Sequence, residues 1–180
     1  EKKTKNTRVV LITDLGNDLM YGVTADELIE SLDMLIDRIL KWNAEIFLTS
    51  IHINIKKDIS RRIFYILRFI FYPRSKINFE EADLLITKIN FYLEEKTRKN
   101  KKVHLITGME SYAGSDKIHY SLLKMHKAWS KVTDEIFSTL NVPVTKKPVF
   151  IDGIISVLSN LKRLIICDIL GWEKKGQDFY

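Results

Sequence analysis

RVVLITDLGND, at residues 8–18, joins a short apolar run to a polar turn and sets the expected architecture. Residues 8–13 are apolar and rich in β-branched side chains, which is typical of a strand buried on both faces of a sheet. Polar residues 14–18 follow directly. Open parallel sheets bind their ligands at the carboxyl ends of their strands, so this turn is a candidate site.

The rest of the chain alternates between strand-like and helical patterns. We predict strands at residues 45–53 and 103–107. One predicted helix begins at Thr24, and two others span residues 80–98 and 120–140. Thr24 and Glu27 have the spacing of a capping box, which supports the first helix boundary. Strands that alternate with helices of this length predict a three-layer α/β/α fold with a parallel sheet and right-handed crossovers.

Two segments do not fit this alternation. Residues 59–72 are basic, aromatic and apolar on nearly every face, and Pro73 ends the pattern. We consider three roles for residues 61–74: a wall that binds an acyl chain, an interfacial helix that contacts anionic lipid, or a helix buried against the tail. The tail, residues 141–180, carries an amphipathic helical pattern. Burial against the tail is the most economical of the three roles.

Composition excludes several classes of protein. The chain has 180 residues, of which 46% are hydrophobic, and a net charge of +6. Its lysines are spread along the sequence, so we expect solvated surface charge and no nucleic-acid partner. One cysteine, no metal-ligand cluster and no glycine-rich phosphate loop predict neither a metal nor another cofactor. The chain shows no signal peptide and no apolar run of the ~18 residues that span a membrane, and its localisation stays open.

The turn at Gly16, Asn17 and Asp18 has two interpretations. Glycine allows close approach to a ligand, and the Asn17 amide can donate a hydrogen bond to the oxyanion formed in acyl transfer. The alternative is a plain turn whose polar residues cap a helix.

A second polar motif, DKIH at residues 116–119, follows the third predicted strand. Its spacing allows Asp116 to accept a hydrogen bond from Nδ1 of His119 while Nε2 faces a substrate, as in the orienting half of a catalytic triad. A capping aspartate beside a surface histidine is the alternative. His52, in the second predicted strand, is a further candidate to line the site.

Together the two motifs resemble those of the SGNH hydrolases, also called GDSL-type esterases and lipases. Members of that superfamily carry a serine, a glycine, a Gly-x-Asn-Asp block and an Asp-x-x-His block, in that order. Asn17 and Asp18 match the third block, and Asp116 and His119 match the fourth. The resemblance implies that Asn17 donates to the oxyanion, that His119 is the general base and that Asp116 orients it.

The resemblance covers residues 8–140 and has two departures. Leu15 stands where the superfamily has the glycine of its third block, and the serine and glycine blocks are absent. Ser31, Ser50, Ser60 and Ser75 all follow the asparagine block, so none matches the nucleophile. We therefore expect residues 1–140 to be an SGNH-like domain that is incomplete at its amino terminus, with residues 141–180 as a helical extension packed on it. About 50 to 90 residues would be missing upstream.

The expected activity is hydrolysis of a small-molecule or lipid ester by a Ser-His-Asp triad whose serine lies outside this chain. Asn17, Asp116 and His119 are the expected catalytic residues, and Gly16, Asp18 and His52 would line the substrate site. The alternative is a non-catalytic SGNH-like domain that has lost its nucleophile and binds a ligand or a partner. A membrane-surface contact through residues 61–74 fits either function.

Overall fold

The computed structural model describes residues 7–121, 123–143, 155 and 158. The chain forms two compact units: residues 1–111 with 116–118 make the first unit, and residues 112–115 with 119–180 make the second unit. The first unit is mixed α/β and is built on a small parallel sheet. The expectation of a mixed α/β fold with a parallel sheet is therefore confirmed.

The sheet has three strands, in the order β1-β2-β3. They are β1 (Val9–Ile12), β2 (Glu45–Thr49) and β3 (Val103–Ile106). Both pairs are parallel, with Val10 opposite Ile46 and Ile46 opposite Val103. The second strand is shorter than the predicted residues 45–53. It ends early because the backbone of Ile51 pairs with the side chain of Asn90 instead of a neighbouring strand.

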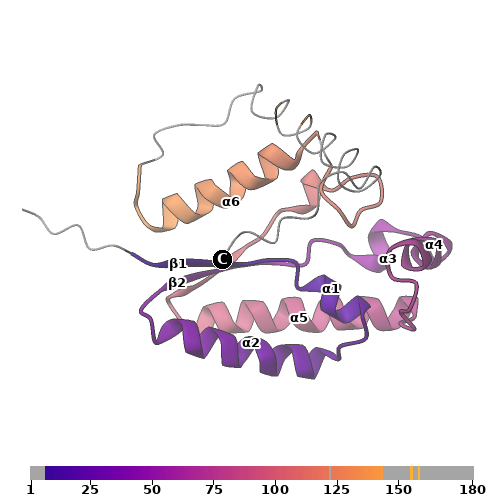
Figure 1. Cartoon of the computed structure of the whole chain (residues 1–180), viewed down its shortest axis with the longest axis horizontal. Coiled ribbons are helices and arrows are strands. Elements are labelled where there is room, and N and C mark those ends of the chain that lie inside the picture. Colours follow the sequence, from indigo (N-terminus) through magenta and orange to yellow (C-terminus); the bar gives the residue numbers. More distant parts are fainter. Residues whose placement is uncertain (1–6, 122, 144–154, 156–157, 159–180) are drawn as a thin grey trace, which may run out of the picture. The chain divides into compact units, whose positions relative to one another are not determined.

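Two long helices, α2 (Ala25–Leu40) and α5 (Phe79–Lys99), cover one face of the sheet (Figure 1). Successive βαβ connections that step in one direction and have the same hand place their helices on one face. The capping box predicted at Thr24 and Glu27 is present in both directions. The buried residues of α2 and α5 pack in the hydrophobic core of the first unit: Leu28, Leu32, Ile36, Ile39, Ile86, Ile89 and Leu93.

Polar contacts also join α2 to α5. The hydroxyl of Tyr92 donates to Oδ1 of Asp33 at 2.7 Å, and Lys96 pairs with the same carboxylate. Nearer the start of α2, Lys88 pairs with Asp26 at 2.7 Å. These contacts align the two helices, while burial of their apolar faces supplies most of the stabilisation.

Three shorter helices complete the first unit: α1 (Gly16–Met20), α3 (Ile55–Asp58) and α4 (Arg61–Phe71). Helix α4 is the basic and aromatic segment of the sequence. Its Phe64 is buried, with its ring edge-on to Phe79 of α5 at 5.6 Å. Tyr72 leaves the helical conformation, as expected before Pro73, which disfavours helical backbone in the residue that precedes it.

The second unit contains α6 (Met125–Thr139), and the 3-10 helix η1 (Glu110–Tyr112) precedes it in the chain. The predicted helix at residues 120–140 was wrong for residues 120, 121, 123 and 124, which precede the start of α6. Tyr120 instead forms an antiparallel bridge with Ala113, and the N–H of Ser121 donates to the carbonyl of Tyr112 at 2.9 Å. The helix expected in the tail lies outside the described residues, apart from residues 141–143, 155 and 158.

Candidate functional site

The candidate site lies at the carboxyl ends of the three strands in the first unit. His52 follows β2, and its imidazole hydrogen-bonds to the backbone of Lys117 and Ile118, in the loop after β3. The negative charge of Asp14, which follows β1, also acts on this imidazole and favours its protonated form. The structure thus brings together the ends of all three strands around one histidine.

The first predicted motif forms helix α1, which was not expected from the sequence. Asp14 has a left-handed backbone with a φ of 63°, and the N–H of Asn17 donates to its carbonyl at 3.2 Å. Aspartate tolerates this conformation better than most residues do, so the chain turns sharply from β1 into α1. The turn places Asn17 within the first turn of the helix, close to the end of β1.

The side chain of Asn17 is held by a residue far away in the sequence. Oδ1 of Asn17 accepts a hydrogen bond from the hydroxyl of Tyr72 at 2.5 Å. Because this donor occupies the carbonyl end of the amide, the Nδ2 group is the end that can donate to a ligand. The Asn17 side chain is therefore held in place, with its amide N–H groups left for the donor role that the sequence predicts.

Gly16 and Asp18 flank this asparagine and differ in setting. Gly16 has no left-handed φ, and a Cβ atom there would lie 3.4 Å from Cγ2 of Ile51, an ordinary contact. Its backbone therefore does not require glycine. Asp18 is exposed, and α1 has no side-chain cap on its first turn. The alternative interpretation, in which these polar residues cap a helix, lacks its hydrogen bond.

The second predicted motif is divided between the two units: residues 116–118 belong to the first unit and His119 belongs to the second. Oδ1 of Asp116 accepts the N–H of Ile118 at 3.1 Å, and Lys117 between them has a left-handed φ of 62°. His119 belongs to the second unit, where its carbonyl accepts the N–H of Gly114 at 2.7 Å. The expected hydrogen bond from Nδ1 of His119 to Asp116 stays a prediction.

Burial governs the charge state of His52. Desolvation lowers the pKa of this imidazole below its usual 6.5, against the opposing effects of the Glu110 charge, the backbone of residues 117–118 and the Asp14 charge. The lowered pKa keeps His52 neutral at pH 7, so its ring can donate or accept a hydrogen bond without bringing a charge into the site.

The loop that carries His52 is fixed by one side chain of α5. Oδ1 of Asn90 accepts the N–H of Ile51 at 2.9 Å, and Nδ2 of Asn90 donates to the carbonyl of Ile51 at 2.9 Å. An asparagine amide can satisfy both backbone groups of one residue in this way. This pair sets the position of His52 immediately after it.

Two residues of the site, Glu110 and Tyr72, were not among those predicted from the sequence, whereas Asp14 belongs to the predicted turn at residues 14–18. Glu110 follows β3, and its place after a predicted strand was the signal that could have found it. Tyr72 left no such signal. It lies 55 residues from Asn17 in the sequence, and only the folding of the first unit brings its hydroxyl to the Asn17 side chain.

Comparisons of the chain with family models, curated proteins and solved structures returned no match. Among the residues that the structure describes, no group of three or more histidine, cysteine or carboxylate side chains could hold a metal ion. The contacts at the carboxyl ends of the strands are therefore the observations from which a function is inferred.

Proposed function

We propose that the protein is an ester hydrolase with a three-layer α/β/α fold of the SGNH type. The observation that carries the proposal is the hydrogen bond from Tyr72 to Asn17, which holds the Asn17 side chain in the turn that follows β1 and occupies its oxygen, leaving the amide N–H groups as donors. Asp116 lies in the loop after β3. His52, which follows β2, contacts the backbone of this loop at residues 117–118, so the loop lies near the carboxyl ends of the strands. This edge is where parallel sheets carry their sites.

In the proposed reaction, His119 removes the proton from a serine hydroxyl as the oxygen attacks the ester carbonyl. The Asp116 carboxylate orients the imidazole and stabilises its positive charge. Nδ2 of Asn17 donates to the oxygen that becomes negative in the tetrahedral intermediate. The reaction requires a serine nucleophile, and residues 1–180 supply none that matches the SGNH order.

The other site residues would surround the substrate. Gly16, against Ile51, and the exposed Asp18 flank the donor, and neutral His52 offers an uncharged polar wall. A neutral wall favours an uncharged ester over a charged substrate, because burying an unpaired charge is costly. We therefore propose a small-molecule or lipid ester as substrate.

Hydrolysis of p-nitrophenyl esters by the natural gene product tests the proposal. His119→Ala should lower kcat by about 10⁴-fold, and Asp116→Ala should lower it by a comparable factor. Asn17→Ala should lower kcat by about 10²-fold with little change in KM, because the oxyanion forms only in the transition state. His126→Ala, which changes a histidine of α6, is the matched control and should keep its rate.

A fluorophosphonate probe supplies the independent readout, since it labels activated serines. Labelling of a serine in the natural protein, lost on His119→Ala, supports the proposal. Absence of both turnover and labelling would contradict it and favour the non-catalytic binding domain.

A further inference from the structure

Helix α4 presents a large apolar surface to its surroundings. We call it the outward face of α4, and it consists of Ile63, Ile66, Phe69 and Ile70, all of them exposed. Their spacing of three and four residues places them along one side of the helix. Phe69 is 74% exposed and Ile66 is 58% exposed. Exposed apolar surface of this kind marks an interaction site.

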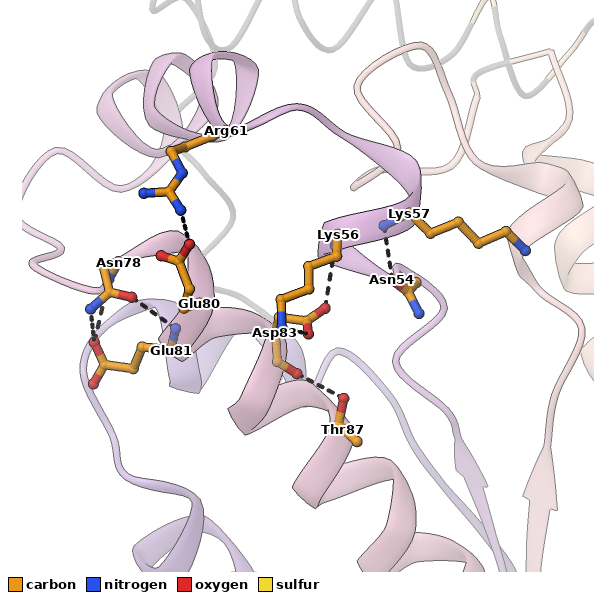
Figure 2. A network of polar contacts seen from close by, with 9 residues as sticks. All are labelled: Asn54, Lys56, Lys57, Arg61, Asn78, Glu80, Glu81, Asp83 and Thr87. Atoms are coloured by element: carbon orange, nitrogen blue, oxygen red, sulfur yellow. Dashed lines mark hydrogen bonds and ion pairs between the residues drawn. The ribbon is translucent and has the colours of Figure 1, made fainter.

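The helix does not need this face for its own packing. Its first residue, Arg61, pairs with Glu80 of α5, and the neighbouring α3 is joined to α5 through Lys56 and Asp83 at 3.1 Å (Figure 2). Arg68 donates to the carbonyl of Ile77 at 2.5 Å. These contacts attach α4 to the rest of the first unit and do not use the outward face, which therefore stays available in a helix of fixed position.

The same region holds the positive charge of the protein. Residues 56–76 contain seven basic residues and one acidic residue, a net charge of +6, and the remaining chain has 22 of each sign. Arg62, Arg74 and Lys76 have no ion-pair partner among the described residues. The net charge of the whole chain therefore equals that of the segment that contains α4, although Lys56 and Arg61 of this segment pair with carboxylates of α5.

We propose that the outward face of α4 binds the surface of an anionic lipid bilayer. The apolar side chains would enter the boundary between headgroups and acyl chains, and the nearby arginine and lysine side chains would contact lipid phosphates. Charge complementarity favours this occupant, because a bilayer offers an apolar layer directly beneath a dense layer of negative charge. No helix of the described residues is long and apolar enough to cross a bilayer.

Co-sedimentation with vesicles tests the surface without any measurement of catalysis. The full chain should pellet with vesicles of equal parts phosphatidylcholine and phosphatidylglycerol, and at least tenfold less with pure phosphatidylcholine. Binding should weaken as salt is added, because salt screens the charge attraction. Loss of ester hydrolysis in the experiments above would leave this result unaffected.

Paired variants identify the face. Ile66→Ser with Phe69→Ser should reduce vesicle binding at least tenfold, and Arg62→Glu with Arg74→Glu should do the same. Leu84→Ser with Phe91→Ser is the matched control, since these α5 residues are 67% and 61% exposed. The control should bind as the unchanged protein does, and circular dichroism should show that all variants are folded.

Three outcomes would overturn the proposal. The unchanged protein could ignore anionic vesicles, or the serine variant could bind them as well as the unchanged protein does. In the third outcome, analytical ultracentrifugation without lipid would show a dimer that dissociates on Ile66→Ser with Phe69→Ser. That result would assign the face to a second copy of this chain.

Discussion

Tyr72 donates its hydroxyl hydrogen to Oδ1 of Asn17 across 2.5 Å, which links the end of α4 to the start of α1. The ring of Tyr72 is buried and packs edge-on against Tyr21, with centroids 5.3 Å apart. Burial and the charges of Tyr21 and Asp14 raise the pKa of Tyr72, so the hydroxyl stays protonated in neutral and alkaline solution. The donor that holds Asn17 is therefore present at neutral pH.

Removal of this hydroxyl tests the link. Tyr72→Phe keeps the ring and leaves Oδ1 of Asn17 without its donor, so the free energy of unfolding should fall by about 1 kcal/mol. Urea denaturation followed by circular dichroism measures the change. Tyr21→Phe is the control, because Tyr21 is 69% exposed and contributes its ring to the contact. Equal effects of the two variants would contradict a specific role for the Tyr72 hydroxyl.

Protonation of His52 should destabilise the fold. Its pKa in the folded protein is below 6.5 because of burial, so the unfolded chain binds more protons as the pH falls from 7.5 towards 5. Stability should decrease over this interval and level off once the pH is below the folded pKa. A midpoint below 6.5 in the NMR titration of the His52 ring would confirm the direction of the shift.

A variant without this imidazole separates its effect from that of other groups. His52→Asn should show a smaller loss of stability between pH 7.5 and pH 5 than the unchanged protein. Asp33 and Glu27 also have lowered pKa values, but their usual values of 3.8 and 4.5 place their effects at lower pH. A slope that is the same with and without His52 would show that its protonation does not limit stability.

Local patterns in the sequence predicted the frame of the first unit. The capping box of Thr24 and Glu27 identified the start of α2, because its two reciprocal hydrogen bonds lie within four residues. The apolar run at residues 8–13 contains β1, as predicted, although β1 is not buried on both faces: Val9 is exposed and Val10, Leu11 and Ile12 are half-buried. Both features depend on short-range chemistry that a sequence records directly.

Features that depend on distant partners could not be predicted. Tyr120 pairs with Ala113, so helix α6 begins at Met125 although the amphipathic pattern starts earlier. His52 acquires its lowered pKa from burial and from neighbours after β1 and β3. The placement of Asn17 depends in the same way on Tyr72, for which the local sequence gives no indication.

Asn90 should be essential for the loop that carries His52. Asn90→Ala removes both hydrogen bonds to the partly buried backbone of Ile51, and the free energy of unfolding should fall by about 2 kcal/mol. The loop would also admit water, so the pKa of His52 should move back towards 6.5. NMR titration of the variant measures the shift. Thr87→Ala is the control on the same helix, because its hydroxyl is exposed and bonds only to the carbonyl of Asp83. An unchanged His52 titration in the Asn90 variant would contradict the link.

The last prediction concerns Asp33, the carboxylate that joins α2 to α5. Burial alone would raise its pKa, but hydrogen bonds from Lys96 and Tyr92 and the charge of Lys96 lower it below 3.8. Asp33→Asn should reduce the free energy of unfolding at pH 7 by about 1 kcal/mol, since the site is partly exposed and solvent screens the pair.

The pH dependence of this loss separates a charge effect from a packing effect. A carboxylate with a lowered pKa stabilises the fold above its unfolded value, and this contribution disappears as the pH falls through the folded pKa. The difference between the unchanged protein and Asp33→Asn in urea denaturation should therefore shrink below pH 3.8. Asp26→Asn is the control, because Asp26 also pairs with a lysine of α5 but is 83% exposed, and it should change stability by less than about 0.5 kcal/mol. A difference for Asp33→Asn that persists at low pH would assign its effect to side-chain packing.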